Sequence, residues 1–117
     1  MRSNRTLLAL ADIRDNCRVA REFVEGMTFA VFAADRRTFY AVTRALEIVS
    51  EAARRLPAEV RERRPDLPWR AIMGAGNIYR HDYDNVAEEF IWRTLNESVP
   101  ELLAASEEEI ARFDETS

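Results

Sequence analysis

Residues that break helices are scarce in this chain, and no segment alternates apolar and polar residues for long enough to form a strand. Only 3 Gly and 4 Pro occur among 117 residues, so few turns are signalled. Apolar residues instead recur every three or four positions, which is the spacing of a helix with one buried face. The sequence therefore predicts an all-α fold, an antiparallel bundle of four to five helices with short connections.

Capping and turn residues divide the helical pattern into segments. Ser3 or Asn4 can cap a first helix that ends at Gly26. Asp35 can cap a second long helix, and Pro57 ends it. Three more helices are expected, at Trp69–His81, Val86–Asn96 and Glu101–Phe113. Two short segments could be either helix or turn: Thr28–Ala34 and Ala58–Arg64.

The composition is that of one globular domain, which we place over residues 1–117. Hydrophobic residues make up 47% and charged residues 32%, which argues against disorder. The net charge of -4 argues against a protein that coats nucleic acid, but it leaves room for a local basic cleft. All 17 basic residues are Arg, which reflects either codon usage or a need for bidentate phosphate contacts.

Cysteine usage and hydropathy bear on the compartment. Cys17 is the single cysteine, so no disulfide can form within the chain, and its position on a helix face predicts a buried core thiol. Met1–Leu8 lacks the pattern of a signal peptide, and the longest apolar run, Phe29–Ala34, is too short to span a membrane. We therefore expect a cytoplasmic protein.

One polar, aromatic-rich segment, from Asn77 to Tyr83, contains the single histidine of the chain. If the helix continues, Asn77, Arg80 and His81 share one face, because residues three and four apart are neighbours. This combination suits RNA cleavage without a metal or other cofactor. His81 can move a proton near neutral pH, and Arg80 can neutralise charge on a phosphate. Asn77 and Tyr83 can contact phosphate or base.

Each of these residues also has a plain structural interpretation. A single helical histidine is more often a surface or capping residue than a catalyst, and the same holds for one arginine. Gly74 and Gly76 suit close helix contacts better than a phosphate-binding loop, because no strand precedes them. His81, Asp82 and Asp84 are too few for a convincing metal site. Residue chemistry alone therefore does not establish a nuclease.

Longer stretches of the chain resemble one known family. They are Leu67–Gly74, Arg80–Tyr83, Ile91–Trp92, Val99–Leu102, Asp35–Thr38 and Leu46–Ala53. In these stretches the chain resembles the HepT-like HEPN-domain ribonuclease toxins, which are encoded beside minimal nucleotidyltransferases in bacterial and archaeal toxin–antitoxin pairs. The resemblance runs from about Leu7 to Phe113.

The resemblance implies a HEPN-like helical bundle and a homodimer in which two copies of the motif face one cleft. It also implies metal-independent endoribonuclease activity on RNA and a nucleotidyltransferase antitoxin as partner. That partner would block the cleft by attaching AMP to the motif tyrosine, which corresponds to Tyr83. Glu51 matches an acidic position of the family. Three roles are open for this residue: it faces the cleft, it packs between helices, or it contributes to the dimer.

The chain departs from the family pattern at one position. The motif is an Arg, four to six residues, and then His-x-Tyr, and His81-Asp82-Tyr83 matches its second half. Gly76 stands five residues before His81, where the family usually has its Arg. Arg80 lies about one helical turn further on and can approach the same phosphate. Either Arg80 substitutes for the missing arginine, or this member is weakened as a nuclease.

The sequence leaves two main hypotheses for the function and a third that is less favoured. The preferred hypothesis is a ribonuclease toxin with Arg80 and His81 as catalytic residues and Asn77, Tyr83 and Glu51 at the substrate. The alternative is a HEPN dimer without catalysis that binds nucleotide, RNA or only its partner protein. The third is a plain helical adaptor, in which no pocket would surround the motif.

Overall fold

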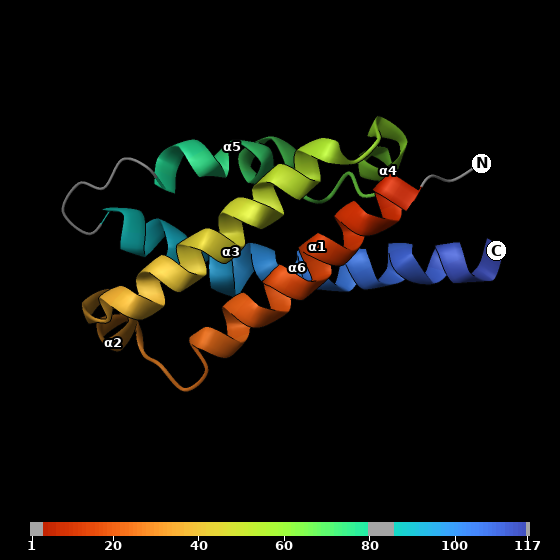
Figure 1. Cartoon of the computed structure of the whole chain (residues 1–117). Coiled ribbons are helices and arrows are strands. Elements are labelled where there is room, and N and C mark those ends of the chain that lie inside the picture. The colour runs from red at the N-terminus through yellow and green to blue at the C-terminus, as the bar shows by residue number, and fades with distance from the viewer. Residues whose placement is uncertain (1–3, 80–85, 117) are drawn as a thin grey trace.

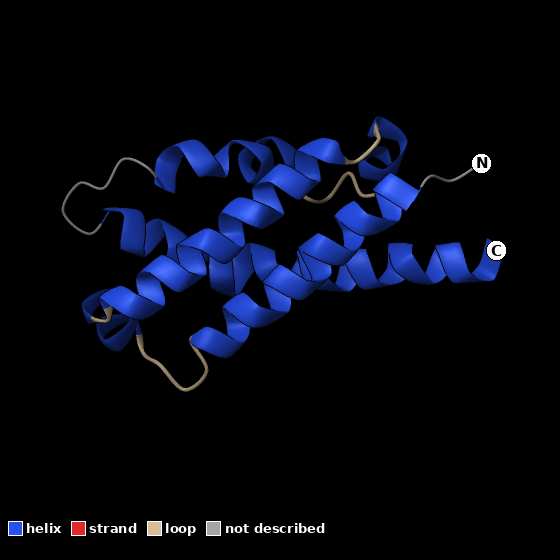
Figure 2. Ribbon diagram, in the orientation of Figure 1, coloured by secondary structure: helices blue, strands red, loops and turns tan. Residues whose placement is uncertain are grey.

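The computed structural model confirms the all-α fold. It describes residues 4–79 and 86–116, with side chains at positions 4–74 and 87–113, and every regular element in these ranges is a helix (Figure 2). In chain order these are α1 (Asn4–Phe23), α2 (Phe29–Ala34), α3 (Arg36–Arg55), α4 (Ala58–Glu62), α5 (Trp69–Tyr79) and α6 (Val86–Thr116).

Four longer helices form an antiparallel bundle (Figure 1). Helix α1 packs along α3 on one side and along α6 on the other, and α5 packs along α3. Helix α5 also contacts α6, which closes the ring. As a result, the end of α5 and the start of α6 lie at the same end of the molecule as α2, while α4 lies at the opposite end (Figure 1).

The core runs along the axis of this bundle. Its largest fully buried apolar side chains come from α1, α2, α3 and α6: Leu10, Ile13, Phe32, Val42, Ile91, Leu95 and Val99. Cys17 is also buried, as the sequence predicts, and burial raises the pKa of its thiol to about 12. This thiol is therefore part of the packing and is protonated at physiological pH.

Local sequence signals set most of the helix boundaries as predicted. The carboxylate of Asp35 caps α3 by accepting from the backbone N–H of Thr38 at 3.1 Å and from its hydroxyl at 2.8 Å. Gly26 adopts a φ of 79°, which favours glycine, and it ends the turn that follows α1. Pro57 and Pro68 precede α4 and α5, where a proline costs no helix hydrogen bond.

The division into helices differs from the prediction in two ways. Both open segments are helical, as α2 and α4, so the described part of the chain holds six helices. The sequence also predicts two helices near the C-terminus, Val86–Asn96 and Glu101–Phe113, with a break at Pro100. That prediction is wrong, because α6 is one helix with Pro100 inside it.

Packing on both sides of Pro100 explains why α6 continues. Pro100 has no N–H to donate to the carbonyl of Asn96, which normally breaks a helix. Here Val99 before the proline and Leu102 after it are both buried, so the apolar stripe passes through the proline. Arg21 of α1 also stabilises this part of α6, because its Nη1 donates to the carbonyl of Leu95 and to Oδ1 of Asn96, each at 3.2 Å.

A buried carboxylate fastens the segment around α4 to α6. The side chain of Glu109 is 2% exposed, and Arg63 and Arg64 donate to it, with Arg63 Nε at 3.1 Å and Arg64 Nη2 at 3.3 Å. Burial acts to raise the pKa of Glu109, but the hydrogen bond and charge of Arg63, with the charges of Arg64 and Arg112, hold it below its ordinary value. Glu109 is therefore ionised and paired.

None of the helices in the described ranges combines the length and the apolar character that crossing a bilayer requires.

Candidate functional site

The predicted catalytic segment lies between α5, which ends at Tyr79, and α6, which begins at Val86. Arg80, His81 and Tyr83 lie outside the described residues, so their predicted roles stay predictions. Asn77 belongs to the last turns of α5, but its side chain is also outside the described set. The helices that lead into and out of this segment fix where it begins and ends.

Glu51, the remaining predicted site residue, lies on α3. Its side chain is 60% exposed, and its Oε1 is 3.7 Å from Nη1 of Arg55, one helical turn away. Arg55 also pairs with Asp12 of α1 at 2.8 Å. Glu51 thus faces solvent on the outer side of α3, and a role at the substrate stays a prediction.

Helix α3 holds α5 close to the point where the motif begins. The carbonyl of Met73 accepts from Oγ of Ser50 at 3.0 Å and from Nη1 of Arg54. Ser50 is 1% exposed, and Nη1 of Arg54 also lies 3.2 Å from its hydroxyl. These bonds fix α5 along α3 one turn before Asn77. The sequence signal for this contact is Ser50, a polar residue on the otherwise apolar stripe of α3.

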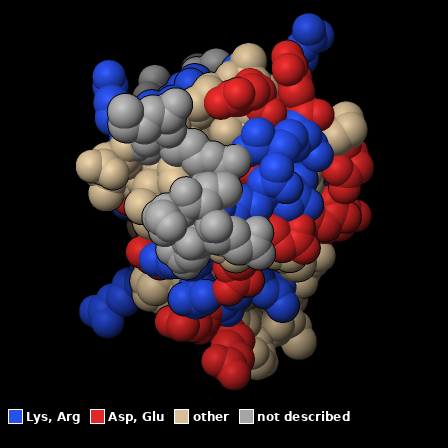
Figure 3. Space-filling model, turned by 90° about the vertical axis from the view of Figure 1, so that its right-hand side faces the viewer, with Lys and Arg blue, Asp and Glu red and all other residues tan. Residues whose placement is uncertain are grey.

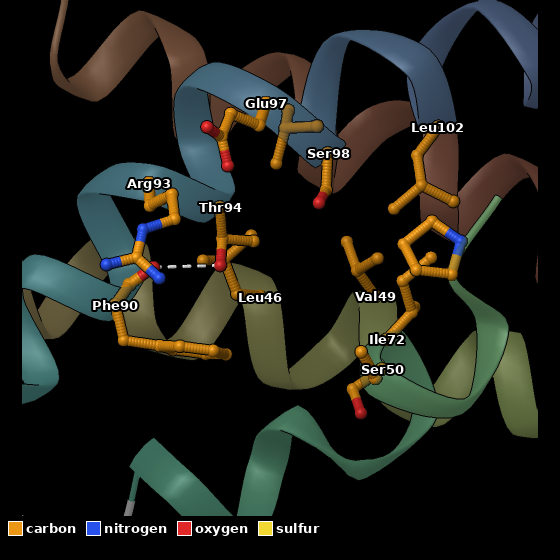
Figure 4. Close-up of a pocket in the computed structure, with 13 residues that line it drawn as sticks. Leu46, Val49, Ser50, Ile72, Phe90, Arg93, Thr94, Glu97, Ser98 and Leu102 are labelled. Carbon is orange, nitrogen blue, oxygen red and sulfur yellow. Dashed lines mark hydrogen bonds between the residues drawn. The ribbon is translucent and has the colours of Figure 1, made fainter.

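A cavity of about 130 Å³ separates α5 from α6, with α3 as its floor (Figure 4). Leu46 and Val49 of α3 and Ile72 of α5 give it an apolar lining (Figure 4). Arg93 and Glu97 of α6 stand at its edge with opposite charges. Because its lining is mostly apolar and its edge carries both signs, the cavity suits an apolar group better than a phosphate.

The first turn of α6 contains an acidic group that the sequence reasoning missed. Glu88 is 9% exposed, and its Oε2 is buried with no hydrogen-bond partner within the described part of the chain. A carboxylate in the first turn of a helix is favoured by the helix dipole. Glu88 is only two residues into α6, so a buried carboxyl group lies close in the chain to the predicted catalytic segment.

The opposite end of the molecule has a different character. Figure 3 shows that face, where basic side chains are bordered by acidic ones. Arg63 and Arg64 pair there with Glu109, and Arg64 also pairs with Glu108 at 2.6 Å. Because these arginines are engaged by carboxylates, this end is a structural ion-pair cluster rather than a phosphate site.

Comparison with known proteins settles the family. The family model described as "Ribonuclease HepT-like" matches residues 13–109, from α1 to the buried Glu109 of α6. The chain belongs to the HepT-like ribonuclease family. This HepT-like chain is 33% identical over 93 residues to "Probable ribonuclease HepT" of Thermococcus cleftensis, which covers 80% of this chain and 84% of the relative.

A second relative of the HepT-like chain supports the same assignment. A protein of Caldanaerobacter subterraneus subsp. tengcongensis named "Putative RNase" is 37% identical over 93 residues, covering 80% of this chain and 83% of the relative. No solved structure is significantly similar to the chain. The family assignment confirms the resemblance seen in the sequence, and it covers all four helices of the bundle.

Proposed function

We propose that this chain is a metal-independent endoribonuclease and the toxin of a type VII-like HEPN/nucleotidyltransferase toxin–antitoxin pair. The observation that carries the proposal is the family match over residues 13–109, a range that includes the His81-Asp82-Tyr83 motif. Relatives named as ribonucleases align with 80% of the chain. This membership supports a ribonuclease function, and the motif supplies the groups for its chemistry.

The proposed reaction uses a nucleophile from the substrate itself. The ribose 2′-hydroxyl attacks the neighbouring phosphorus, the P–O5′ bond breaks, and the products are a 2′,3′-cyclic phosphate and a 5′-hydroxyl. His81 moves the proton that leaves the 2′-oxygen or enters the 5′-oxygen. Arg80 neutralises the charge that grows on the phosphate, and Asn77 and Tyr83 hold the substrate.

The proposed active form is a homodimer in which two copies of the motif share one cleft. The end of α5 and the start of α6 are at one end of the bundle, so a second copy placed against that end brings the two segments together (Figure 1). A symmetric interface of this kind uses the same surface of both subunits. The cleft between them would admit one RNA strand.

Growth arrest tests the toxin assignment. Expression of the wild-type chain without an antitoxin is expected to stop growth, and His81→Ala is expected to remove the effect by eliminating the proton-transfer group. Circular dichroism of the purified variant should show unchanged helix content. Equal arrest by wild type and folded variant would exclude His81 from the mechanism.

Gly76 favours a second candidate, a HEPN dimer that binds RNA, nucleotide or its partner without cutting RNA. The family usually has its motif Arg at this position, so this chain lacks one cationic group that would contact the phosphate. If wild type binds RNA without cleaving it and Gly76→Arg creates cleavage, the binding module is the correct assignment. If wild type already cleaves and Arg80→Gln abolishes it, Arg80 substitutes for the missing arginine.

The proposed partner is a minimal nucleotidyltransferase that modifies Tyr83. In the modification, the tyrosine oxygen attacks the α-phosphorus of ATP, and pyrophosphate leaves as AMP becomes attached. The added charge and bulk would block RNA from the cleft. Incubation with the neighbouring nucleotidyltransferase, ATP and Mg²⁺ should raise the mass of the chain by one AMP. No such gain for wild type, or an equal gain for Tyr83→Phe, would contradict the assignment.

A further inference from the structure

The ring of Tyr40 is unusually exposed for an aromatic side chain of this bundle. Tyr40 is 59% exposed, whereas Phe32 is fully buried and Phe39 is partly buried against the core. Phe29 and Phe32 pack on Trp92 with ring centroids 6.0 and 5.3 Å apart. Tyr40 therefore contributes little to the core, and its exposed ring calls for another explanation.

The exposed ring is held in place by its neighbours. Arg36, one turn earlier on α3, donates from Nη2 to the Tyr40 hydroxyl at 3.0 Å, and its guanidinium carbon lies 5.4 Å from the ring centroid. The ring of Phe39 meets that of Tyr40 edge-on, with centroids 5.8 Å apart. A ring fixed in this way loses little side-chain freedom when a ligand stacks on it.

Tyr40 lies on the exposed outer face of α3, the same face that carries Arg36, Arg44 and Glu51. Ser50 and Arg54, further along α3, bond to Met73 of α5 and fix how far α5 reaches along α3. The two helices are antiparallel (Figure 1). Counting back from Ser50 to Tyr40 covers about 15 Å, and α5 extends about 9 Å from Met73 to its end. Along the axis of α3, Tyr40 thus lies just past the level at which α5 ends.

Basic side chains surround this ring. Arg36 and Arg37 are both exposed in the first turn of α3. Arg44, one turn beyond Tyr40, is 69% exposed, and its nearest carboxylate contact is a long one of 3.8 Å to Glu47. The carboxylate of Asp35 is engaged by the capping hydrogen bonds of the helix. The start of α3 therefore presents positive charge around an aromatic ring, which complements a phosphate chain carrying bases.

We propose that Tyr40 and Arg36 form a base-stacking platform that holds single-stranded RNA beside the end of α5. An unpaired base stacks on the exposed tyrosine ring or on the guanidinium plane next to it, while Arg37 and Arg44 contact neighbouring phosphates. The inference rests on the proposed ribonuclease function for its choice of RNA as the ligand. It adds a substrate contact outside the motif, on a helix that the motif does not include.

The test measures RNA binding apart from cleavage. In a His81→Ala background and in EDTA, a fluorescent single-stranded oligoribonucleotide is titrated and its Kd is read by anisotropy. Tyr40→Ala should weaken binding about fivefold to a hundredfold, as loss of one stacked base does. Tyr40→Phe keeps the ring and should bind within about twofold of the parent. Leu8→Ala, which removes an exposed apolar side chain of α1, is the matched control and should bind like the parent.

A second probe separates stacking from charge. An abasic ribose-phosphate oligomer of the same length carries the phosphates without bases, so Tyr40→Ala should leave its Kd unchanged while Arg37→Gln weakens it. Equal RNA affinity of Tyr40→Ala and its parent would overturn the platform. So would a change in oligomeric mass on light scattering, because the ring would then belong to a contact between subunits. If the wild type fails to cleave but these binding differences appear, the ribonuclease proposal fails and the platform stands.

Discussion

Single polar residues inside this bundle act as fixed connections between helices. Glu109 ties α6 to the segment around α4 through Arg63 and Arg64, and Ser50 ties α3 to α5 through the Met73 carbonyl. A buried carboxylate is costly unless it is paired, and removing one member of such a pair is costlier still. These residues are therefore expected to show large effects on stability, unlike the exposed ion pairs of the surface.

Glu109→Gln is expected to lower the free energy of unfolding by about 3 kcal/mol. This value is at the low end of the range for a broken buried ion pair, because Arg63 and Arg64 keep partial access to water. Urea denaturation followed by circular dichroism measures it. Glu107→Gln is the matched control, since Glu107 and its partner Arg18 are about half exposed. That control should change the free energy of unfolding by less than about 1 kcal/mol. Equal effects of the two substitutions would contradict the importance of burial.

Glu109 is also expected to make the free energy of unfolding depend on pH. The pKa of Glu109 in the folded chain lies below its ordinary value of 4.5, so the unfolded chain takes up this proton first as the pH falls. The stabilisation from Glu109 is therefore complete above pH 4.5 and is lost as the pH falls through the folded-state pKa. Between neutral pH and about pH 3.5, wild type should lose more stability than Glu109→Gln. Parallel losses would contradict the pairing.

At the scale of elements, α5 depends on α3 more than on its own sequence. It has 11 residues and contains both Gly74 and Gly76, each of which costs a helix about 1 kcal/mol relative to alanine. The cavity beside α6 also deprives it of contacts on that side. The hydrogen bonds from Ser50 and Arg54 to the Met73 carbonyl thus help to set its position against α3.

The hydrogen bonds from Ser50 and Arg54 to the Met73 carbonyl form a clamp on α5. Removing this clamp should loosen α5 without unfolding the bundle. Arg54→Gln and Ser50→Ala should each speed hydrogen exchange of the α5 amides about fivefold, the equivalent of one net hydrogen bond of ~1 kcal/mol. Exchange in α1 should change less. Arg55→Gln removes the ion pairs with Asp12 and Glu51, neither of which is on α5, and is the control. If exchange in α5 is no faster in the clamp variants than in this control, the clamp does not hold the helix.

Element boundaries could be predicted from sequence wherever a local residue decides them. Asp35 and Gly26 act through their own side chain or backbone, and both predictions are confirmed. The effect of Pro100 on the helix could not be predicted in this way, because the helix around it is stabilised by burial of Val99 and by Arg21 from another helix. A local pattern does not contain contacts made between distant segments.

At the scale of the whole molecule, the antiparallel bundle brings the two helix ends that flank the predicted catalytic segment to one end. The end of α5, the start of α6, α2 and the start of α3 meet there, and α4 with the ion-pair cluster is at the other (Figure 1). The motif and the family could be recognised from sequence, because His81-Asp82-Tyr83 lies within a resemblance that covers most of the chain. The position of Tyr40 and Arg36 level with the end of α5 could not be predicted, since it depends on how α3 packs against α5.

The most direct test is cleavage of a 5′-labelled single-stranded RNA by purified protein in EDTA. The wild-type chain should produce fragments ending in a 2′,3′-cyclic phosphate, because the 2′-hydroxyl is the proposed nucleophile and no metal is required. His81→Ala, folded as judged by circular dichroism, should leave the RNA intact. Intact RNA with the wild type, or equal cleavage by wild type and His81→Ala, would contradict the account.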